Sequence, residues 1–177
     1  MAIRSLAVFC GSKEGNDPLF CGHARQLGYM LAQKNITLIY GGGNKGIMGT
    51  IASAVLEKNG KVIGIIPKIL TAWEHQHPGV TELHEVEDMH TRKRMLYERC
   101  DAALILAGGY GTMDELFEIL TWNQLNIHDK KIIILNTLGF YDHLIMHLKA
   151  MEEQNFLYHK VIDGLTIISS PDELILE

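Results

Sequence analysis

The chain alternates short apolar runs, rich in β-branched residues, with longer stretches of helical periodicity. The apolar runs are Leu6–Cys10, Thr37–Tyr40, Val62–Ile66, Ala102–Leu106, Lys131–Leu135 and Leu165–Ile168. The helix-like stretches lie near residues 18–34, 47–58, 89–100, 113–125 and 141–154. Strands that are apolar on both faces and alternate with helices are typical of a parallel sheet covered on both sides. The sequence therefore predicts one Rossmann-like, doubly wound α/β domain over residues 1–177.

Composition limits the classes of partner. The chain has 177 residues, of which 47% are hydrophobic, and its formal net charge is −5. That acidic balance argues against a nucleic-acid partner but leaves room for a small anionic ligand. The sequence contains no apolar run of the roughly 20 residues that cross a membrane. Cys10, Cys21 and Cys100 form no CxxC motif, so we expect neither a disulfide framework nor a zinc site, and a reducing cytoplasm is favoured.

The glycines are concentrated where a ligand would bind. Nine of the 17 glycines lie in three segments that directly follow predicted strands: Gly11-Ser12, Gly41–Gly49 and Gly108–Thr112. In open parallel sheets, ligands bind beyond the carboxyl ends of the strands. These segments are therefore the candidate binding loops.

The segment Gly41–Gly46 fits the pattern G-x-G-x-x-G. It follows the second strand rather than the first, and the next strand ends in Pro67-Lys68 without the acid that holds a ribose hydroxyl. NAD(P) binding is therefore disfavoured. We expect Gly42 and Gly43 to lie near a ligand, although a tight turn explains them too. Ser12 has the same two interpretations, ligand contact or turn.

The segment Ala107–Glu115 joins a strand to a glycine turn and a helix that we expect to start at Thr112. Backbone N–H groups and the helix dipole there would hold a phosphate. No Gly-Lys-Ser/Thr follows, so this is not a Walker A loop. Glu115 has two interpretations of equal weight. It would complete a capping box with Thr112, or act on a sugar attached to the phosphate.

Other candidates have structural explanations. His75 and His77 suggest a metal pair but have no third ligand, so an exposed loop is favoured. Cys10 precedes Gly-Ser but has no identifiable histidine partner, so packing is favoured over nucleophilic catalysis. Leu116, Trp122 and Leu125 have helical spacing and indicate core or a dimer interface.

Two further motifs carry a family resemblance. The segment Met89-His90-Thr91-Arg92-Lys93 and the run Gly108-Gly109-Tyr110-Gly111-Thr112-x-x-Glu115 together resemble the Lonely Guy family of cytokinin-activating phosphoribohydrolases. The similarity continues through most of the chain, at 9–12, 40–43, 46–49, 66–68 and 121–128. Ala107 stands where the family motif usually opens with proline, a change that affects loop stiffness but removes no functional group.

The resemblance implies hydrolysis of an adenine-type nucleoside 5′-monophosphate to free base and ribose 5-phosphate. It implies that Arg92 and Glu115 are the catalytic pair, that no metal or redox cofactor is needed, and that the chain forms a homodimer with the site near the interface. The substrate contacts that it implies are Glu74, Arg92, Lys93, Gly109, Tyr110, Gly111, Thr112, Met113, Asp114, Glu115 and Thr121, to which the glycine turn adds Gly108.

Two alternatives accompany this interpretation. Relatives of the family have been labelled lysine decarboxylases, but that reaction needs a lysine Schiff base with pyridoxal phosphate, and no lysine in this sequence stands out in that role. A nucleotide carrier without catalysis would share the same scaffold, because a fold does not determine a function. The sequence does not distinguish AMP from N6-substituted substrates.

Overall fold

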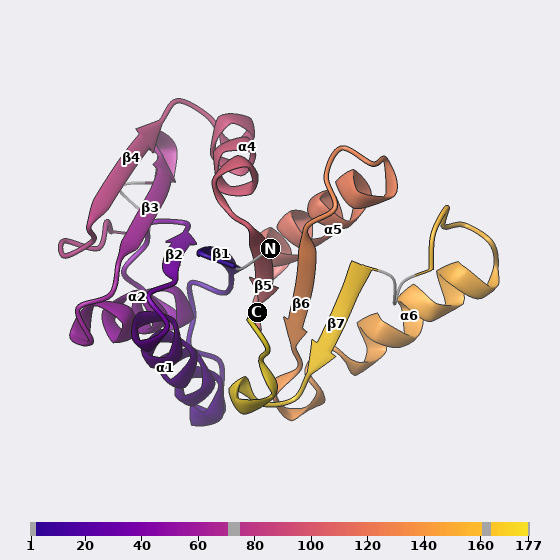
Figure 1. Cartoon of the computed structure of the whole chain (residues 1–177), viewed down its shortest axis with the longest axis horizontal. Coiled ribbons are helices and arrows are strands. Elements are labelled where there is room, and N and C mark those ends of the chain that lie inside the picture. The colour runs from indigo at the N-terminus through magenta and orange to yellow at the C-terminus, as the bar shows by residue number, and fades with distance from the viewer. Residues whose placement is uncertain (1–2, 71–74, 161–163, 177) are drawn as a thin grey trace.

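The computed structural model describes residues 3–70, 75–160 and 164–176. Seven parallel strands form one sheet in the order β4-β3-β2-β1-β5-β6-β7 (Figure 1). The strands are β1 (Ser5–Phe9), β2 (Thr37–Tyr40), β3 (Val62–Pro67), β4 (Glu82–Val86), β5 (Ala102–Ile105), β6 (Lys131–Leu135) and β7 (Leu165–Ile168). The helices are α1 (Pro18–Gln33), α2 (Gly46–Glu57), α4 (Met89–Arg99), α5 (Tyr110–Gln124) and α6 (Asp142–Glu153), with short 3₁₀ turns at Thr137–Gly139 and Pro171–Glu173.

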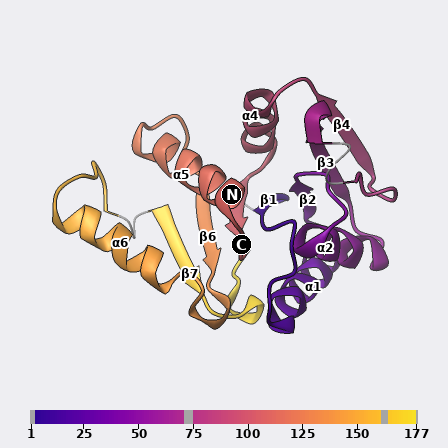
Figure 2. The ribbon, with the colours of Figure 1, turned by 180° about the vertical axis from the view of Figure 1, so that it is seen from behind.

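Helices cover both faces of this sheet, as Figure 1 and its rear view in Figure 2 show. Alternate residues of each strand point to opposite faces. In β1, Leu6 and Val8 join the core under α1 and α2, while Ala7 and Phe9 join the core under α4 and α5. The predicted doubly wound α/β fold is therefore confirmed. Within the described ranges, no helix is long and apolar enough to cross a membrane.

The strand β4 was not expected from the sequence. Its residues Glu82, Leu83 and Glu85 are exposed, and it lies at the edge of the sheet, where it pairs only with β3. A continuous apolar run marks a strand buried on both faces, so a solvated edge strand lacks that signal. The prediction of six strands was therefore one strand short.

The strand order reverses beside β1. The chain builds β1 to β4 outward in one direction and then returns to place β5 on the other side of β1. The Gly11 N–H donates to the Ala107 carbonyl at 3.0 Å, directly beyond the ends of these two strands. Ligands bind at such switch points, so the topology places two of the three glycine segments at the expected site.

A close approach between α1 and α2 depends on Gly28. A Cβ atom added at Gly28 would lie 2.7 Å from the Cβ of Ala54 and 2.9 Å from the Ile51 carbonyl. Gly22 lies in the same helix but is exposed, and the nearest atom to an added Cβ is Leu19 Cδ1 at 3.9 Å. The two glycines thus share a helix but differ in packing.

We expect Gly28→Ala to lower the free energy of unfolding by about 1–3 kcal/mol, because the added methyl pushes two packed helices apart. The matched control Gly22→Ala should raise it by roughly 0.5–1 kcal/mol through helix propensity. Urea denaturation of both variants measures the difference. Equal stabilisation by the two substitutions would contradict the close-packing argument.

Candidate active site

A cavity of about 650 Å³ opens at the carboxyl edge of the sheet. It is lined by the end of β1, by the segment 107–109 that follows β5, and by residues of α1, α2, α4 and α5. The predicted site residues that line it are Ser12, Arg92, Gly108, Gly109, Tyr110, Gly111, Thr112, Asp114 and Glu115. The volume falls in the range of small-molecule sites.

The N-terminus of α5 faces this cavity. The helix begins at Tyr110, and Gly109 is its N-cap, without a side-chain capping bond. The first N–H groups of a helix have no partner within the helix, so those of the first turn are available to an anion. A Cβ atom added at Gly109 or Gly111 would meet nothing within 4 Å, so the backbone there is open to a ligand.

Gly108 serves a different purpose in this turn. A Cβ atom at Gly108 would lie 2.1 Å from the Thr112 Oγ1, and Thr112 itself is only 3% exposed. Glycine therefore allows the first turn of α5 to fold over the end of β5.

The position of Glu115 decides between its two interpretations. Because α5 begins at Tyr110, Thr112 lies inside the helix and is not its N-cap. The predicted helix start at Thr112, and with it the capping box, is therefore wrong. The Glu115 side chain lines the cavity although the residue is only 8% exposed. Glu115 therefore stays a candidate for a chemical role.

Arg92 reaches the cavity from α4. Asp88 caps this helix by accepting the Thr91 N–H at 2.8 Å, a bond that holds the pKa of the Asp88 carboxyl below its usual range. Arg92 is 6% exposed, and its Nε has no hydrogen-bond partner within the part of the chain that the structure describes. A Cβ atom at Gly41 would lie 2.1 Å from the Arg92 Nη2, so the glycine after β2 makes room for the guanidinium.

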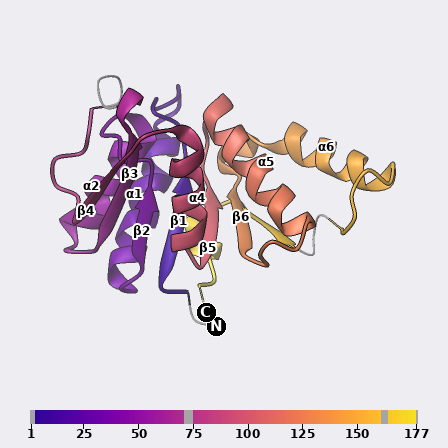
Figure 3. The same ribbon diagram turned by 90° about the horizontal axis from the view of Figure 1, so that it is seen from above.

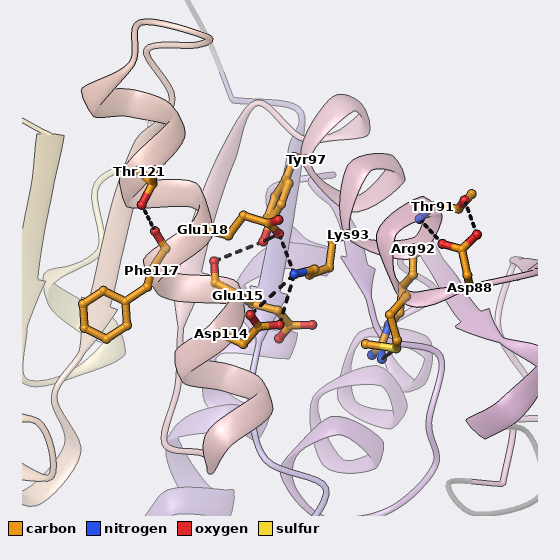
Figure 4. A network of polar contacts seen from close by, with 11 residues as sticks. Asp88, Thr91, Arg92, Lys93, Tyr97, Asp114, Glu115, Phe117, Glu118 and Thr121 are labelled. Carbon is orange, nitrogen blue, oxygen red and sulfur yellow. Dashed lines mark hydrogen bonds and ion pairs between the residues drawn. The ribbon is translucent and has the colours of Figure 1, made fainter.

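Lys93 points away from Arg92, toward α5 (Figure 4). Its Nζ lies 3.2 Å from Asp114 Oδ2 and 3.1 Å from Glu118 Oε2. Burial lowers the pKa of Lys93, but hydrogen bonds and charges from Glu118 and Asp114 outweigh burial and raise it. The ammonium group is therefore held between two carboxylates, and Lys93 is not among the residues that line the cavity.

Other predicted contacts also lie away from the cavity wall. The Gly42 carbonyl accepts the His77 N–H, and Gly43 bridges to Gln76, so these glycines hold the segment 75–77. Met113 packs against the core beneath α4 and α5. Thr121 donates to the Phe117 carbonyl at 2.6 Å and lines a second cavity of about 500 Å³. Glu74 lies outside the described residues.

The sequence predicted an exposed loop for His75 and His77, and this prediction is wrong for His77. His75 is exposed, but His77 is buried, and its Nε2 lies 3.1 Å from the Ser53 Oγ. Its Nδ1 accepts the Gly79 N–H at 3.2 Å, and burial lowers its pKa, so the neutral ring has a structural role. No group of metal-binding side chains occurs among the described residues.

Packing explains most of the remaining candidates. Cys10 is 7% exposed and joins the core, although it also borders the cavity. Leu116 is fully buried and Trp122 packs against the ring of Tyr97, whereas Leu125 is 57% exposed. Core packing is thus confirmed for Leu116 and Trp122 but not for Leu125.

Part of the cavity wall was not predicted from the sequence. An apolar group completes it: Phe20, Ile47, Met48, Leu70, Met89 and Phe140. The rings of Phe20 and Phe140 meet edge to face at 5.7 Å. Ile47, Met48 and Met89 lie in segments that carry the family resemblance, whereas Phe20, Leu70 and Phe140 lie in none of them, and the fold brings the six together.

Solved structures share this architecture. A molybdenum cofactor binding protein from Rippkaea orientalis aligns with a TM-score of 0.71 and 24% identity, over 97% of this chain and 93% of that chain. A molybdenum cofactor carrier protein from Chlamydomonas reinhardtii aligns with a TM-score of 0.70 and 17% identity, over 95% and 90% of the two chains. At these identities the likeness shows the fold alone.

Sequence comparisons are more specific. The family model described as "Possible lysine decarboxylase" matches residues 48–177. A rice protein (Oryza sativa subsp. japonica) described as a probable cytokinin riboside 5′-monophosphate phosphoribohydrolase is 48% identical over 94% of this chain and 74% of its own length. Two proteins named cytokinin riboside 5′-monophosphate phosphoribohydrolase are also similar. The one from Arabidopsis thaliana is 43% identical over 87% of this chain and 72% of its own length. The one from Rhodococcoides fascians is 40% identical over 87% of this chain and 78% of its own length.

The family model and the relatives together cover nearly the whole chain, including both motifs that line the cavity. The model and the relatives are described by different reactions, a decarboxylation for the model and a phosphoribohydrolysis for the relatives. The relatives are the more specific guide, because each aligns with this chain at 40% identity or more. The chain belongs to the Lonely Guy family of phosphoribohydrolases.

Proposed function

We propose that this chain hydrolyses the N-glycosidic bond of adenine-type nucleoside 5′-monophosphates, AMP or its N6-substituted forms, to free base and ribose 5-phosphate. One observation carries the proposal. Arg92 from α4 and Glu115 from α5 line the same cavity as the open N-terminus of α5. A cation, a carboxylate and a backbone anion site are the groups that this reaction needs. The similar proteins from Arabidopsis thaliana and Rhodococcoides fascians are named for this chemistry.

The 5′-phosphate would occupy the turn Gly108–Thr112. The free N–H groups of the first turn of α5 would donate to its oxygens, and the helix dipole would add favourable charge. Ser12 borders the same space beyond β1. Binding energy from the phosphate, which does not react, would position the sugar for the chemical step.

Cleavage of the bond between the ribose C1′ and the base nitrogen leaves positive charge on the sugar. The Glu115 carboxylate would stabilise that charge and accept a proton from the attacking water. The water oxygen bonds to C1′, and the departing base gains a proton. Arg92 would hold the phosphate or Glu115 and balance the negative charge.

The base would lie against the apolar wall of the cavity. Ile47, Met48 and Met89 provide polarisable or aliphatic surface, and Phe20 and Phe140 provide aromatic surface. The transfer of a purine ring from water to such a wall costs little free energy. The wall therefore suits an adenine base better than a second charged group.

A homodimer is the second part of the proposal. Phe117, Leu125, Phe156 and Tyr158 are exposed and line the cavity between α5, α6 and the segment after α6; we call them the α5–α6 face. Thr121, an implied substrate contact, lies on this face and not in the first cavity. If it touches substrate, a second copy must bring it there.

We also propose a cytoplasmic location. Cys100 forms no disulfide and is buried, and burial raises the pKa of its thiol to about 11. Free thiols of this kind persist in a reducing compartment.

Replacing Glu115 by Gln should lower kcat about 10²- to 10⁴-fold, because the amide neither accepts a proton nor balances the sugar charge. Nucleotide affinity should remain. The assay measures free base released from AMP and from N6-isopentenyladenosine 5′-monophosphate. The exposed Glu98→Gln in α4 is the control and should retain normal turnover. Near-normal turnover by the Glu115 variant would refute its role, and a wild-type chain that binds nucleotide without releasing base would favour a carrier.

Replacing Arg92 by Ala should lower kcat/KM roughly 10- to 100-fold, the usual effect of losing a hydrogen bond to a charged group. Arg94→Ala is the matched control, since Arg94 is exposed two residues along the same helix. Steady-state kinetics on the same nucleotides distinguishes the two. An Arg92 variant with unchanged rate and affinity would remove this residue from the site.

Sedimentation velocity should show a mass of two chains at micromolar concentration. Phe117→Asp should dissociate the dimer, because it places a charge in the α5–α6 face, and should reduce activity. Ile175→Asp, at an exposed apolar position outside this face, should leave the dimer intact. A monomeric wild type would contradict the proposal, as would a monomeric Phe117 variant with full activity.

A further inference from the structure

Four side chains join α4 to α5. Lys93 and Tyr97 lie one helical turn apart on α4, and Asp114 and Glu118 lie one turn apart on α5. The two pairs face one another (Figure 4), and the helices lie side by side when seen from above (Figure 3). We call these four residues the α4–α5 clasp.

Lys93 provides the charged half of the clasp. Its Nζ contacts Asp114 Oδ2 at 3.2 Å and Glu118 Oε2 at 3.1 Å, and only 11% of its side chain is exposed. A partly buried ammonium group between two carboxylates is held more firmly than an ion pair at the surface. The charge of Lys93 is therefore paired with two carboxylates of α5.

Tyr97 provides the uncharged half. It is fully buried, and its hydroxyl lies 3.0 Å from Glu118 Oε2 and 3.1 Å from the Glu115 carbonyl oxygen, either of which accepts its hydrogen bond. Burial and the charge of Glu118 raise the pKa of Tyr97, so the hydroxyl stays protonated. Its ring also packs edge to face against Phe9 and Trp122, at 5.7 and 5.0 Å.

The clasp adjoins both catalytic candidates. Arg92 precedes Lys93, and Glu115 follows Asp114. Successive helical residues point about 100° apart, so a helix that directs Lys93 at α5 directs Arg92 into the cavity. The Tyr97 hydroxyl also touches the backbone of Glu115 itself. The relative position of the guanidinium and the carboxylate thus depends on how these four side chains meet.

We propose that Lys93, Tyr97 and Glu118 are positioning residues that set Glu115 against Arg92, and that Lys93 acts through α5 rather than on the substrate. This inference rests on the proposed function. It gives Lys93 a role different from the substrate contact that the family resemblance implies.

The test compares Lys93→Met and Tyr97→Phe with the wild type. Each should lower kcat about 10- to 100-fold, because small displacements of reacting groups are costly, while KM changes less than about twofold. Tyr97→Phe keeps the ring contacts, so this variant should fold, and a lower kcat in it would not result from unfolding. Lys93→Arg should restore much of kcat by rejoining both carboxylates. The exposed Arg94→Met is the control in α4 and should leave kcat unchanged.

A double-mutant cycle supplies the decisive measurement. If Lys93 acts through Glu118, the pair Lys93→Met with Glu118→Gln should be no slower than the slower single variant. A double variant whose loss of kcat equals the product of the two single losses would overturn the proposal. An unchanged kcat in Lys93→Met would also overturn it.

A binding measurement keeps this result separate from the proposed reaction. Calorimetric titration with AMP, in the Glu115→Gln background, should give the same affinity within about twofold whether or not the chain also carries Lys93→Met. A tenfold or greater weakening would show that Lys93 touches the ligand and would overturn the proposal. Failure of the wild type to release base would refute the hydrolase function, while these affinities would still decide the role of Lys93.

Discussion

The close approach of two strand ends underlies the whole site. Gly11 follows β1 and Gly108 follows β5, and the Gly11 N–H bonds to the Ala107 carbonyl at 3.0 Å. A Cβ atom on Gly11 would lie 3.3 Å from the Gly108 Cα, so a larger residue would crowd the neighbouring backbone. Gly11 and Gly108 both line the cavity, and α5, which carries Glu115, begins two residues after Gly108.

The fold was predictable because its signals are local and repeated. Six of the seven strands coincide with the short apolar runs of a sheet that is covered on both faces, a pattern that needs no long-range information. Gly41 and Gly108 were predictable for a related reason, since each follows such a strand within a few residues, and Glu115 lies in the helix that comes next. By contrast, β4 is a polar edge strand, and the start of α5 at Tyr110 carries no capping side chain that would mark it in the sequence, because its N-cap is Gly109.

Side-chain direction was the main feature that sequence did not provide. Arg92 and Lys93 are adjacent and both basic, yet one enters the cavity and the other meets Asp114 and Glu118. A motif shows that both residues are present but not which way each points. Thr121 illustrates the same limit on a larger scale, because it lies on the α5–α6 face, away from the cavity that the motif residues share. Such directions follow only from how the helices pack.

The net charge of −5 and an anionic substrate are compatible because the binding charge is local. Arg92 is nearly buried, and its Nε has no hydrogen-bond partner among the described residues, so the protein itself does not replace the hydration that this group loses. An arriving phosphate or a transition state would supply an acceptor. Lys93, beside it, already has two carboxylate partners and would gain little from the same ligand. Asp114 and Glu118 therefore neutralise one of two adjacent cations, and in the proposed reaction the other, Arg92, would give the site a single directed charge instead of a diffuse basic patch.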